Sequence, residues 1–135
     1  MTIFKKIKKA FSDKRGNIID VFQNSPKDHC AIVTFNKGAV RANHYHKTDW
    51  HFCYVMEGSI DYYHRPCGDL KEPELVKINK GQLFFTPPMV EHAMVFKEDT
   101  TFLTLGRNSR EQKVYEEDIE RVMLINPQTL KYDAL

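Results

Sequence analysis

Three histidines within eight residues, His44, His46 and His51, are the part of the sequence with the clearest chemical potential. Imidazole exchanges a proton near neutral pH, and it is also a frequent ligand of divalent transition metals. Alternate residues of a β-strand share a face, so His44 and His46 are expected to point the same way, about 7 Å apart at Cα. The cluster therefore predicts acid–base chemistry or a metal site.

The face that carries these two histidines is expected to include Val40 and Ala42 and to look into the interior of a barrel. Inward imidazoles are costly unless they are hydrogen-bonded or bound to a metal. His92 follows a Pro87-Pro88 corner, which cannot continue a regular strand ladder and can aim a side chain at the same interior. The candidate nitrogen ligands for a divalent Zn, Fe, Ni or Mn ion are His44, His46, His51 and His92.

Short β-branched and aromatic runs, separated by turn residues, must position these side chains. Strands are expected over residues 18–22, 30–35, 39–46, 51–56, 59–65, 75–79, 82–86, 93–96 and 101–105. This density of short strands predicts an all-β sandwich or barrel.

The pattern changes after Leu105. A helix is expected over residues 109–124, with Ser109 as its N-cap, and a frayed tail over residues 126–135. At the other end, the basic stretch MTIFKKIKKAF is expected to be a solvated arm or a subunit-swapped edge segment rather than a membrane-surface helix.

The bulk composition favours an ordinary soluble protein. The chain of 135 residues is expected to form one domain, and its net charge of +2 gives no reason to expect a nucleic-acid partner. No apolar run reaches the roughly 20 residues that span a bilayer, so no membrane insertion is expected. Three cysteines without a CxxC spacing argue against a disulfide framework and favour the reducing cytoplasm.

The histidine spacings resemble a known family pattern. Gly38-x5-His44-x-His46-x4-His51-x6-Gly58 resembles the first signature of the cupin superfamily, which has glutamate at the place of His51. Gly81-x5-Pro87-x-Met89-x2-His92 resembles the second signature, with Met89 where a glycine is usual. The resemblance implies a single cupin-type antiparallel β-barrel or jelly roll over residues 1–135, with its core at about 18–106, a short C-terminal helix, and His44, His46, His51 and His92 as its ligand set.

A narrower resemblance concerns cupins that act on nucleotide sugars. SDKRGNIIDV (12–21), VRANHYHKT (40–48) and PPMVEHAMVF (87–96) are similar to segments of dTDP-4-dehydrorhamnose 3,5-epimerases and dTDP-4-keto-6-deoxyglucose 3,4-ketoisomerases. The resemblance implies that His44 and His46 act as acid and base without a metal, in the biosynthesis of surface polysaccharide sugars. It also implies that Arg41 and Arg15 contact the substrate, with Arg15 at a diphosphate.

Two alternatives remain open, because His51 restores a metal-capable set where the ketoisomerases often have glutamine. One is a metal-dependent, dioxygenase-like enzyme, and the other is a non-catalytic metal- or sugar-binding domain. Tyr54 is added to the catalytic candidates, and Tyr62 and His64 are further possible proton carriers. No organic cofactor is expected, and a cytoplasmic homodimer with a nucleotide-sugar substrate is the favoured description.

Overall fold

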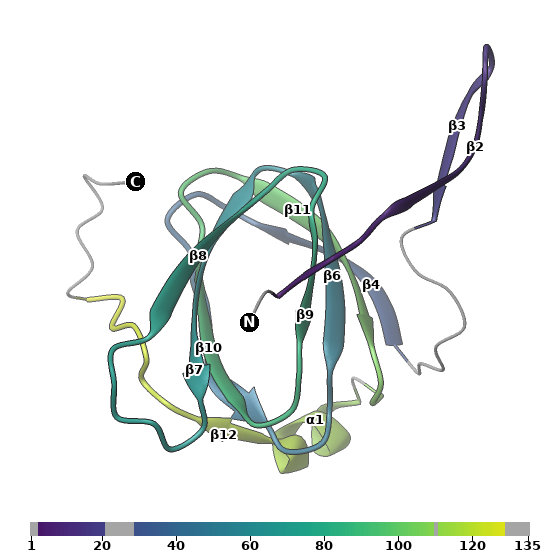
Figure 1. Cartoon of the computed structure of the whole chain (residues 1–135). Helices are drawn as coiled ribbons and strands as arrows, with labels where there is room; N and C mark the ends of the chain where they lie inside the picture. Colours follow the sequence, from purple (N-terminus) through teal and green to yellow (C-terminus); the bar gives the residue numbers. More distant parts are fainter. Residues whose placement is uncertain (1–2, 21–28, 110, 129–135) are drawn as a thin grey trace.

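The computed structural model describes residues 3–20, 29–109 and 111–128. Two five-stranded antiparallel sheets face each other and enclose the interior of a barrel, as Figure 1 shows. The first sheet contains, in spatial order, β1 (Phe4–Lys5), β9 (Leu83–Thr86), β6 (His51–Glu57), β11 (Thr100–Gly106) and β4 (His29–Phe35). The second contains β12 (Ile119–Arg121), β5 (Val40–His46), β10 (Val90–Val95), β7 (Ser59–Pro66) and β8 (Glu74–Asn79). The predicted all-β barrel is confirmed.

The N-terminal strands are arranged differently from the prediction, which placed the start of the barrel core at about residue 18. The expected strand over residues 18–22 is β3 (Gly16–Asp20), which pairs with β2 (Lys8–Asp13) in a hairpin that projects away from the barrel (Figure 1). Residues 21 and 22 of that expectation lie outside the described residues. The barrel is instead completed by β1, whose Phe4 registers with Phe84 of β9.

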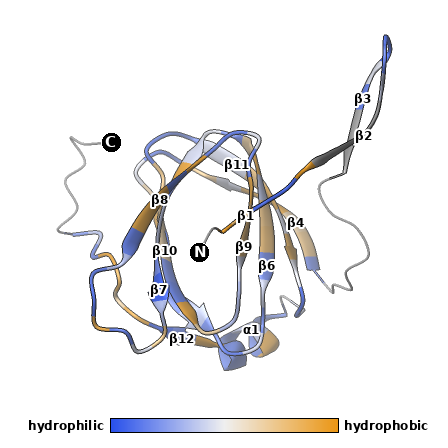
Figure 2. Ribbon diagram, in the orientation of Figure 1, coloured by the Kyte–Doolittle hydropathy of each residue, from blue (hydrophilic) through white to orange (hydrophobic). Residues whose placement is uncertain are grey.

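Alternation along the strands builds the core. Val55, Ile60 and Ile78 are fully buried between the sheets, and the rings of Phe35 and Phe96 stack at 4.6 Å. Figure 2 shows hydrophobic residues interspersed with polar ones along the barrel strands, as expected where one face of each strand is turned inward.

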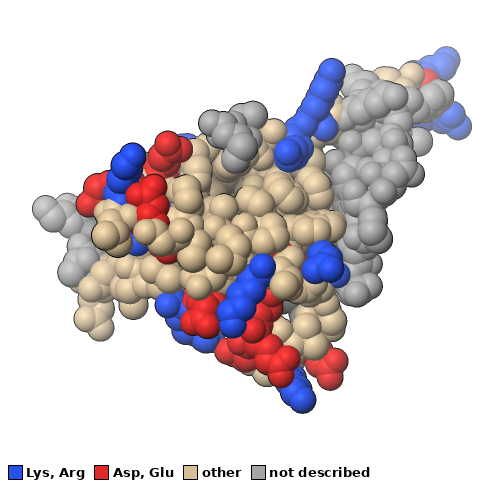
Figure 3. All heavy atoms as spheres, turned by 60° about the horizontal axis from the view of Figure 1, so that its bottom comes forward, with Lys and Arg blue, Asp and Glu red and all other residues tan. Residues whose placement is uncertain are grey.

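Charges are balanced on the surface as well as in the composition. Basic and acidic side chains lie interspersed on the face shown in Figure 3 rather than as a continuous basic surface. Within the described residues, no helix has the length and apolar character needed to cross a membrane.

A β-bulge in β5 changes which residues face the interior. Ala42 and Asn43 adopt positive φ angles of 70° and 55°, and the register with β10 shifts at this point. Arg41 therefore registers with Met94 while His44 registers with His92, two residues that share a face of β10. The expectation that Val40 shares the histidine face is wrong, because Val40 does not line the histidine cavity. Ala42 does line it, and the bulge brings Arg41 to the cavity as well.

The C-terminal helix is shorter than predicted. The helix α1 spans Gln112–Asp118, and Glu111 rather than Ser109 occupies the N-cap position. The chain becomes extended at Ile119 (φ −97°, ψ 148°) and forms β12, because this segment pairs with the otherwise unpaired edge of β5. The expected helix over residues 109–124 is therefore corrected. Of the tail, residues 129–135 lie outside the described residues.

Asn43 fastens this C-terminal segment to the barrel. Its side-chain amide donates to the carbonyl of Ile125 and accepts from the Ile125 N–H, both at 2.9 Å. Its backbone carbonyl accepts from the Val122 N–H at 2.9 Å. The bulge thus turns the histidines inward while the side chain of Asn43, on the outside, holds the segment that follows α1.

Candidate functional site

Five of the six histidines line one cavity of about 180 Å³ inside the barrel. His44, His46 and His92 come from the second sheet, and His29 and His51 come from the first. Apolar side chains such as Phe35, Phe84 and Phe102 form much of the remaining wall. A group of imidazoles in an apolar enclosure is a place where proton transfer or metal binding is chemically plausible.

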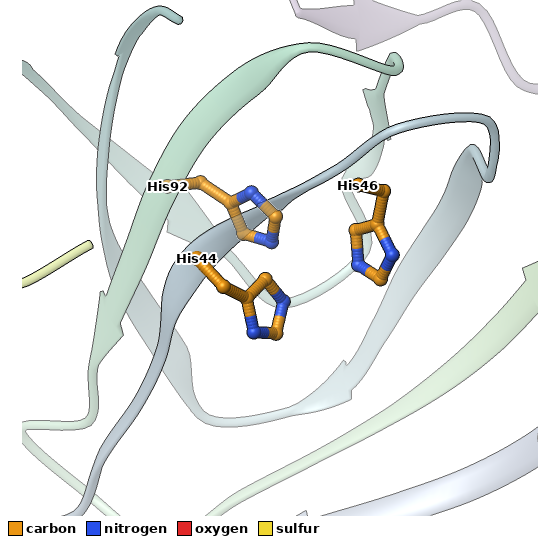
Figure 4. A group of neighbouring side chains, drawn as sticks. All are labelled: His44, His46 and His92. Carbon is orange, nitrogen blue, oxygen red and sulfur yellow. The ribbon is translucent and has the colours of Figure 1, made fainter. Parts of the chain in front are cut away.

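His44, His46 and His92 form the tightest part of this group, and Figure 4 shows their rings converging. His44 and His92 are cross-strand partners with ring centroids 4.9 Å apart, and the rings of His44 and His46 are 4.8 Å apart. One nitrogen of each ring lies within 4.8 Å of the others. The fold therefore brings His44 and His46 of β5 together with His92 of β10 in one cluster.

His46 is held by a buried carboxylate. Its Nδ1 lies 3.0 Å from Oδ2 of Asp118, and the two side chains are only 2% and 7% exposed. A carboxylate accepts hydrogen bonds, so Nδ1 carries the proton and Nε2 carries the lone pair that a base or a metal ligand needs. Burial, with a smaller contribution from His51, lowers the pKa of His46 and keeps the ring neutral.

Asp118 is itself fully hydrogen-bonded. Its Oδ1 accepts from the backbone N–H and the hydroxyl of Thr48, at 2.8 and 2.7 Å. Burial alone would raise the pKa of Asp118, but the bonds from Thr48 and His46 outweigh it and hold this pKa below its usual range. The carboxylate therefore stays ionised beside a neutral imidazole, the arrangement that fixes the orientation and tautomer of a catalytic or ligating histidine.

His92 presents its Nε2 in the same way. Its Nδ1 lies 3.0 Å from the backbone carbonyl of Val90, which can only accept, so the Nδ1 atom is the donor. Complete burial lowers the pKa of His92 to about 3. His92 is thus a neutral ring whose remaining lone pair belongs to Nε2.

The ring of His51 lies 4.8 Å from that of His46, but His51 is bonded to a second carboxylate and its nitrogens are not part of the converging set of three. Its Nε2 lies 3.0 Å from Oδ2 of Asp49, whose side chain is 3% exposed. Oδ1 of Asp49 accepts from the backbone N–H groups of Trp50 and Asn108, both at 2.9 Å. Burial alone would raise the pKa of Asp49, but the bond from His51 and the other donors hold this pKa low. The ligand role predicted for His51 therefore competes with the bond between its Nε2 and Asp49.

Gly106 makes room for this arrangement. It registers between His29 of β4 and His51 of β6, and a Cβ at this position would lie 2.9 Å from Cδ2 of His51. Any larger residue would displace the His51 ring from Asp49.

The tyrosine of the site is not the one predicted from the sequence. Tyr54 does not line the cavity, because His51 and Cys53 alternate onto the inner face of β6 and leave Tyr54 on the outer one. Tyr115 of α1 lines the cavity instead, with its ring 6.2 Å from that of His44 and 6.1 Å from that of His46. Tyr115, rather than Tyr54, is therefore a tyrosine within reach of the histidines.

Tyr62 also lines the cavity, but its hydroxyl is already engaged. It lies 2.7 Å from Oγ1 of Thr86, and burial raises the pKa of Tyr62 well above its usual value. This hydroxyl is a poor proton donor at neutral pH.

The two predicted substrate-binding arginines are far from equivalent. Arg41 lines the histidine cavity, with its exposed guanidinium 5.2 Å above the ring of Phe35. Arg15 lies at the tip of the β2–β3 hairpin, 83% exposed and bonded to Asp13 at 2.8 Å. The fold brings Arg41 to the histidines of its own chain and carries Arg15 away from them (Figure 1).

Four residues of the site were missed in the sequence: His29 and Tyr115, which line the cavity, and Asp49 and Asp118, which bond to its histidines. Asp49 lies beside the histidine cluster, and its proximity to His51 was a usable signal. Asp118 and Tyr115 lie in a segment read as an outer helix, and His29 is isolated in the sequence, so only the three-dimensional structure connects them to the site.

Comparisons with known proteins agree with this architecture. A family model described as "Cupin domain" matches residues 31–105. The sugar 3,4-ketoisomerase QdtA from Thermoanaerobacterium thermosaccharolyticum, solved in complex with TDP, has a TM-score of 0.69 at 18% identity, covering 89% of this chain and 87% of that one.

A second similar structure is the dTDP-4-dehydrorhamnose 3,5-epimerase from Sulfolobus tokodaii, with a TM-score of 0.68 at 17% identity over 91% of this chain and 84% of that one. The capsular polysaccharide assembling protein CapF from Staphylococcus aureus has a TM-score of 0.63 at 15% identity over 87% of this chain and 34% of that one. No curated protein sequence matches the chain. At these identities the structural likeness supports the fold.

Proposed function

The chain belongs to the cupin family, and from this premise we propose that it is a nucleotide-sugar ketoisomerase or epimerase that uses histidine acid–base chemistry. The substrate class is a dTDP-linked 4-keto-6-deoxyhexose, processed for surface polysaccharide sugars. The observation that carries the proposal is the pair of His46 and Asp118, buried at the wall of a small cavity with Nε2 of His46 available as a base.

The reaction begins with removal of a proton from the carbon next to the ketone. Nε2 of the neutral His46 ring takes this proton, and the C–H electron pair becomes the C=C bond of an enediol. The ketone oxygen takes a proton from His44 or Tyr115, whose rings face His46. Asp118 stabilises the imidazolium that forms, because its carboxylate stays ionised.

Return of the proton decides the product. In ketoisomerisation, the neighbouring hydroxyl oxygen gives its proton to the deprotonated His44 or Tyr115 and becomes the new ketone, while the former ketone carbon takes the proton from His46. In epimerisation, a second donor reprotonates the original carbon from the opposite face, and the enol oxygen returns its proton to His44 as the ketone re-forms. Tyr115 of α1 is the candidate for that donor, since it reaches the cavity from outside the sheet that carries His46.

Substrate recognition is assigned to Arg41 at the cavity wall. Its guanidinium is already positioned on the ring of Phe35, and a planar guanidinium suits the oxygens of a diphosphate.

A metal-dependent activity is the second candidate, favoured by the convergence of His44, His46 and His92. These residues fit a divalent transition metal by donor type, because His46 and His92 have Nδ1 engaged elsewhere and Nε2 turned to the cavity. A bound metal would act as a Lewis acid on the ketone oxygen. His44, His46 and His92 would hold it, with His51 retained by Asp49.

A homodimer is proposed from two surface features. Phe52 and Phe85 pack at 4.7 Å on the outer face of the first sheet, where Ile32 is 66% exposed. The projecting β2–β3 hairpin carries Arg15 away from its own barrel, so in a dimer it would cross to the second copy and meet the diphosphate there. We further propose a cytoplasmic location, where the three free cysteines remain reduced. A monomeric mass by light scattering would contradict the dimer.

The function is tested by incubating the purified protein with dTDP-4-keto-6-deoxyglucose in D₂O, with and without EDTA. Proton transfer predicts incorporation of deuterium at the carbons beside the ketone and formation of an isomer, both unaffected by EDTA. Isomerisation that stops with EDTA and returns with added metal would favour the metal-dependent candidate. Absence of both exchange and product would contradict the enzymatic proposal.

A further inference from the structure

A second cavity of about 360 Å³ lies beside the histidine cavity. Tyr62 lines both, so its ring forms a partition between them. The rings of His92, Tyr62 and His64 follow one another at 6.0 and 5.5 Å, which puts His92 on one side of the partition and His64 on the other. The proposed function makes no use of this second cavity.

The rim of the second cavity is rigidly built. Nε of Arg65 donates to Oε1 of Glu91 at 2.7 Å, and its Nη1 donates to the carbonyl of Lys71 at 2.8 Å. The other carboxylate oxygen of Glu91 accepts from the Gly68 N–H at 3.1 Å. Glu91 is 5% exposed, so a buried carboxylate fixes the loop that follows β7 and preorganises the cavity.

One polar atom in this cavity wall lacks a hydrogen bond. Among the described residues, none supplies a hydrogen-bond partner to the buried Nε2 of His64. The nearest carboxylate oxygen, Oε2 of Glu74, is 3.7 Å away, beyond hydrogen-bond distance. Glu74 is 78% exposed and can swing aside. A ligand hydroxyl bonded to both atoms would satisfy them, because a hydroxyl both donates and accepts.

The remaining lining defines the class of ligand. Phe85 and Pro87 offer apolar surface suited to the C–H face of a sugar ring. The charged lining residues are of both signs: Arg65, Lys71, Asp69, Glu72 and Glu74. An anion or a cation would meet repulsion from part of this rim, whereas neutral hydroxyls can pair with either sign. We propose that the second cavity binds a neutral pyranose, with His64 and Glu74 as its hydrogen-bonding residues.

The test is an NMR titration of the full chain with methyl α-D-glucopyranoside, monitored through backbone amide shifts. Saturable shifts are expected at residues around the second cavity, such as His64, Arg65 and Phe85. Binding should weaken roughly tenfold in His64→Phe and in Glu74→Ala, the loss expected for one hydrogen bond. Two variants are used so that the proposal can still be tested if one of them fails to fold.

Glu57→Ala is the matched control. Glu57 is 67% exposed and forms a surface ion pair with Lys80 at 2.9 Å, so its truncation removes the same chemical group at another place. This variant should bind the sugar like the unmodified chain. Shifts confined to the histidine cavity, no saturable shifts, equal binding by all variants, or tighter binding of inorganic phosphate or ethylamine at the second cavity would each overturn the proposal.

Discussion

Asp118 accepts a hydrogen bond from Nδ1 of His46 at 3.0 Å, although 72 residues separate the two in the sequence. The bond sets which nitrogen of His46 faces the cavity, and it ties the end of α1 to the strand that carries two cavity histidines. Our first prediction concerns this contact.

Asp118→Asn is expected to lower kcat about a hundredfold or more, with a smaller effect on KM. The amide can donate to Nδ1 and so favour the wrong tautomer, and it cannot stabilise the imidazolium. Steady-state kinetics with the dTDP-4-keto sugar measure the change. Glu117→Gln, an exposed neighbour, should leave kcat unchanged, and an active Asp118→Asn variant would remove His46 from the role of base.

Arg41→Gln is expected to raise KM for the nucleotide sugar about tenfold or more while kcat changes little. Arg41 reaches the cavity from its edge, above Phe35, so it contributes binding rather than proton transfer. Arg121→Gln is the control, because Arg121 is an exposed cation paired with Glu116. Equal KM values for the two variants would contradict the assignment.

The metal content of His51→Gln is expected to match that of the unmodified chain when both are purified with added Zn²⁺ or Ni²⁺. Asp49 already engages Nε2 of His51, whereas His92→Gln removes one of the three converging rings and should lower the metal content. Elemental analysis decides. Loss of metal in His51→Gln would restore the four-histidine ligand set.

Stability is expected to fall as the pH drops below about 6.5. Burial places the pKa of His92 at about 3 in the folded chain, below the ordinary value of 6.5, so the unfolded chain binds the proton first. The free energy of unfolding should therefore decrease by about 1.4 kcal/mol per pH unit for this residue between pH 6.5 and about 3.

Urea unfolding in EDTA at several pH values measures this slope. The lowered pKa of His46 acts in the same direction, so the full chain should show a steeper slope than His92→Asn. A flat profile between pH 6.5 and 4, or identical slopes for both chains, would mean that His92 is protonated in the folded state.

The parts of the site that follow from local pattern were predictable from the sequence. Strand alternation gives the shared face of His44 and His46, and the proline corner before His92 explains its approach to the same interior. The strands of the barrel also follow from the apolar runs and the turn residues between them, because both signals are contained within a few neighbouring residues.

The errors arise where distant segments decide local structure. The bulge at Ala42 and Asn43 is stabilised by the C-terminal segment and the register of β10, so simple alternation predicts Val40 rather than Arg41 beside the histidines. Likewise, the end of the expected helix forms β12 instead, because this segment pairs with β5. Tyr54, expected near the barrel mouth, lies on the outer face of β6, whereas Tyr115 reaches the cavity only through the folded chain.

The hydrogen bonds between Asn43 and Ile125 attach the C-terminal segment to β5, and this attachment can form only late in synthesis. All the barrel strands except β12 have been synthesised by Gly106, yet the carboxylate partner of His46 follows at Asp118. While this segment is still inside the ribosome, the nascent chain can contain every cavity histidine. Without Asp118, however, nothing holds the proton of His46 on Nδ1. We therefore expect docking of the late segment onto β5 to be the step that sets the tautomer of His46, the proposed base.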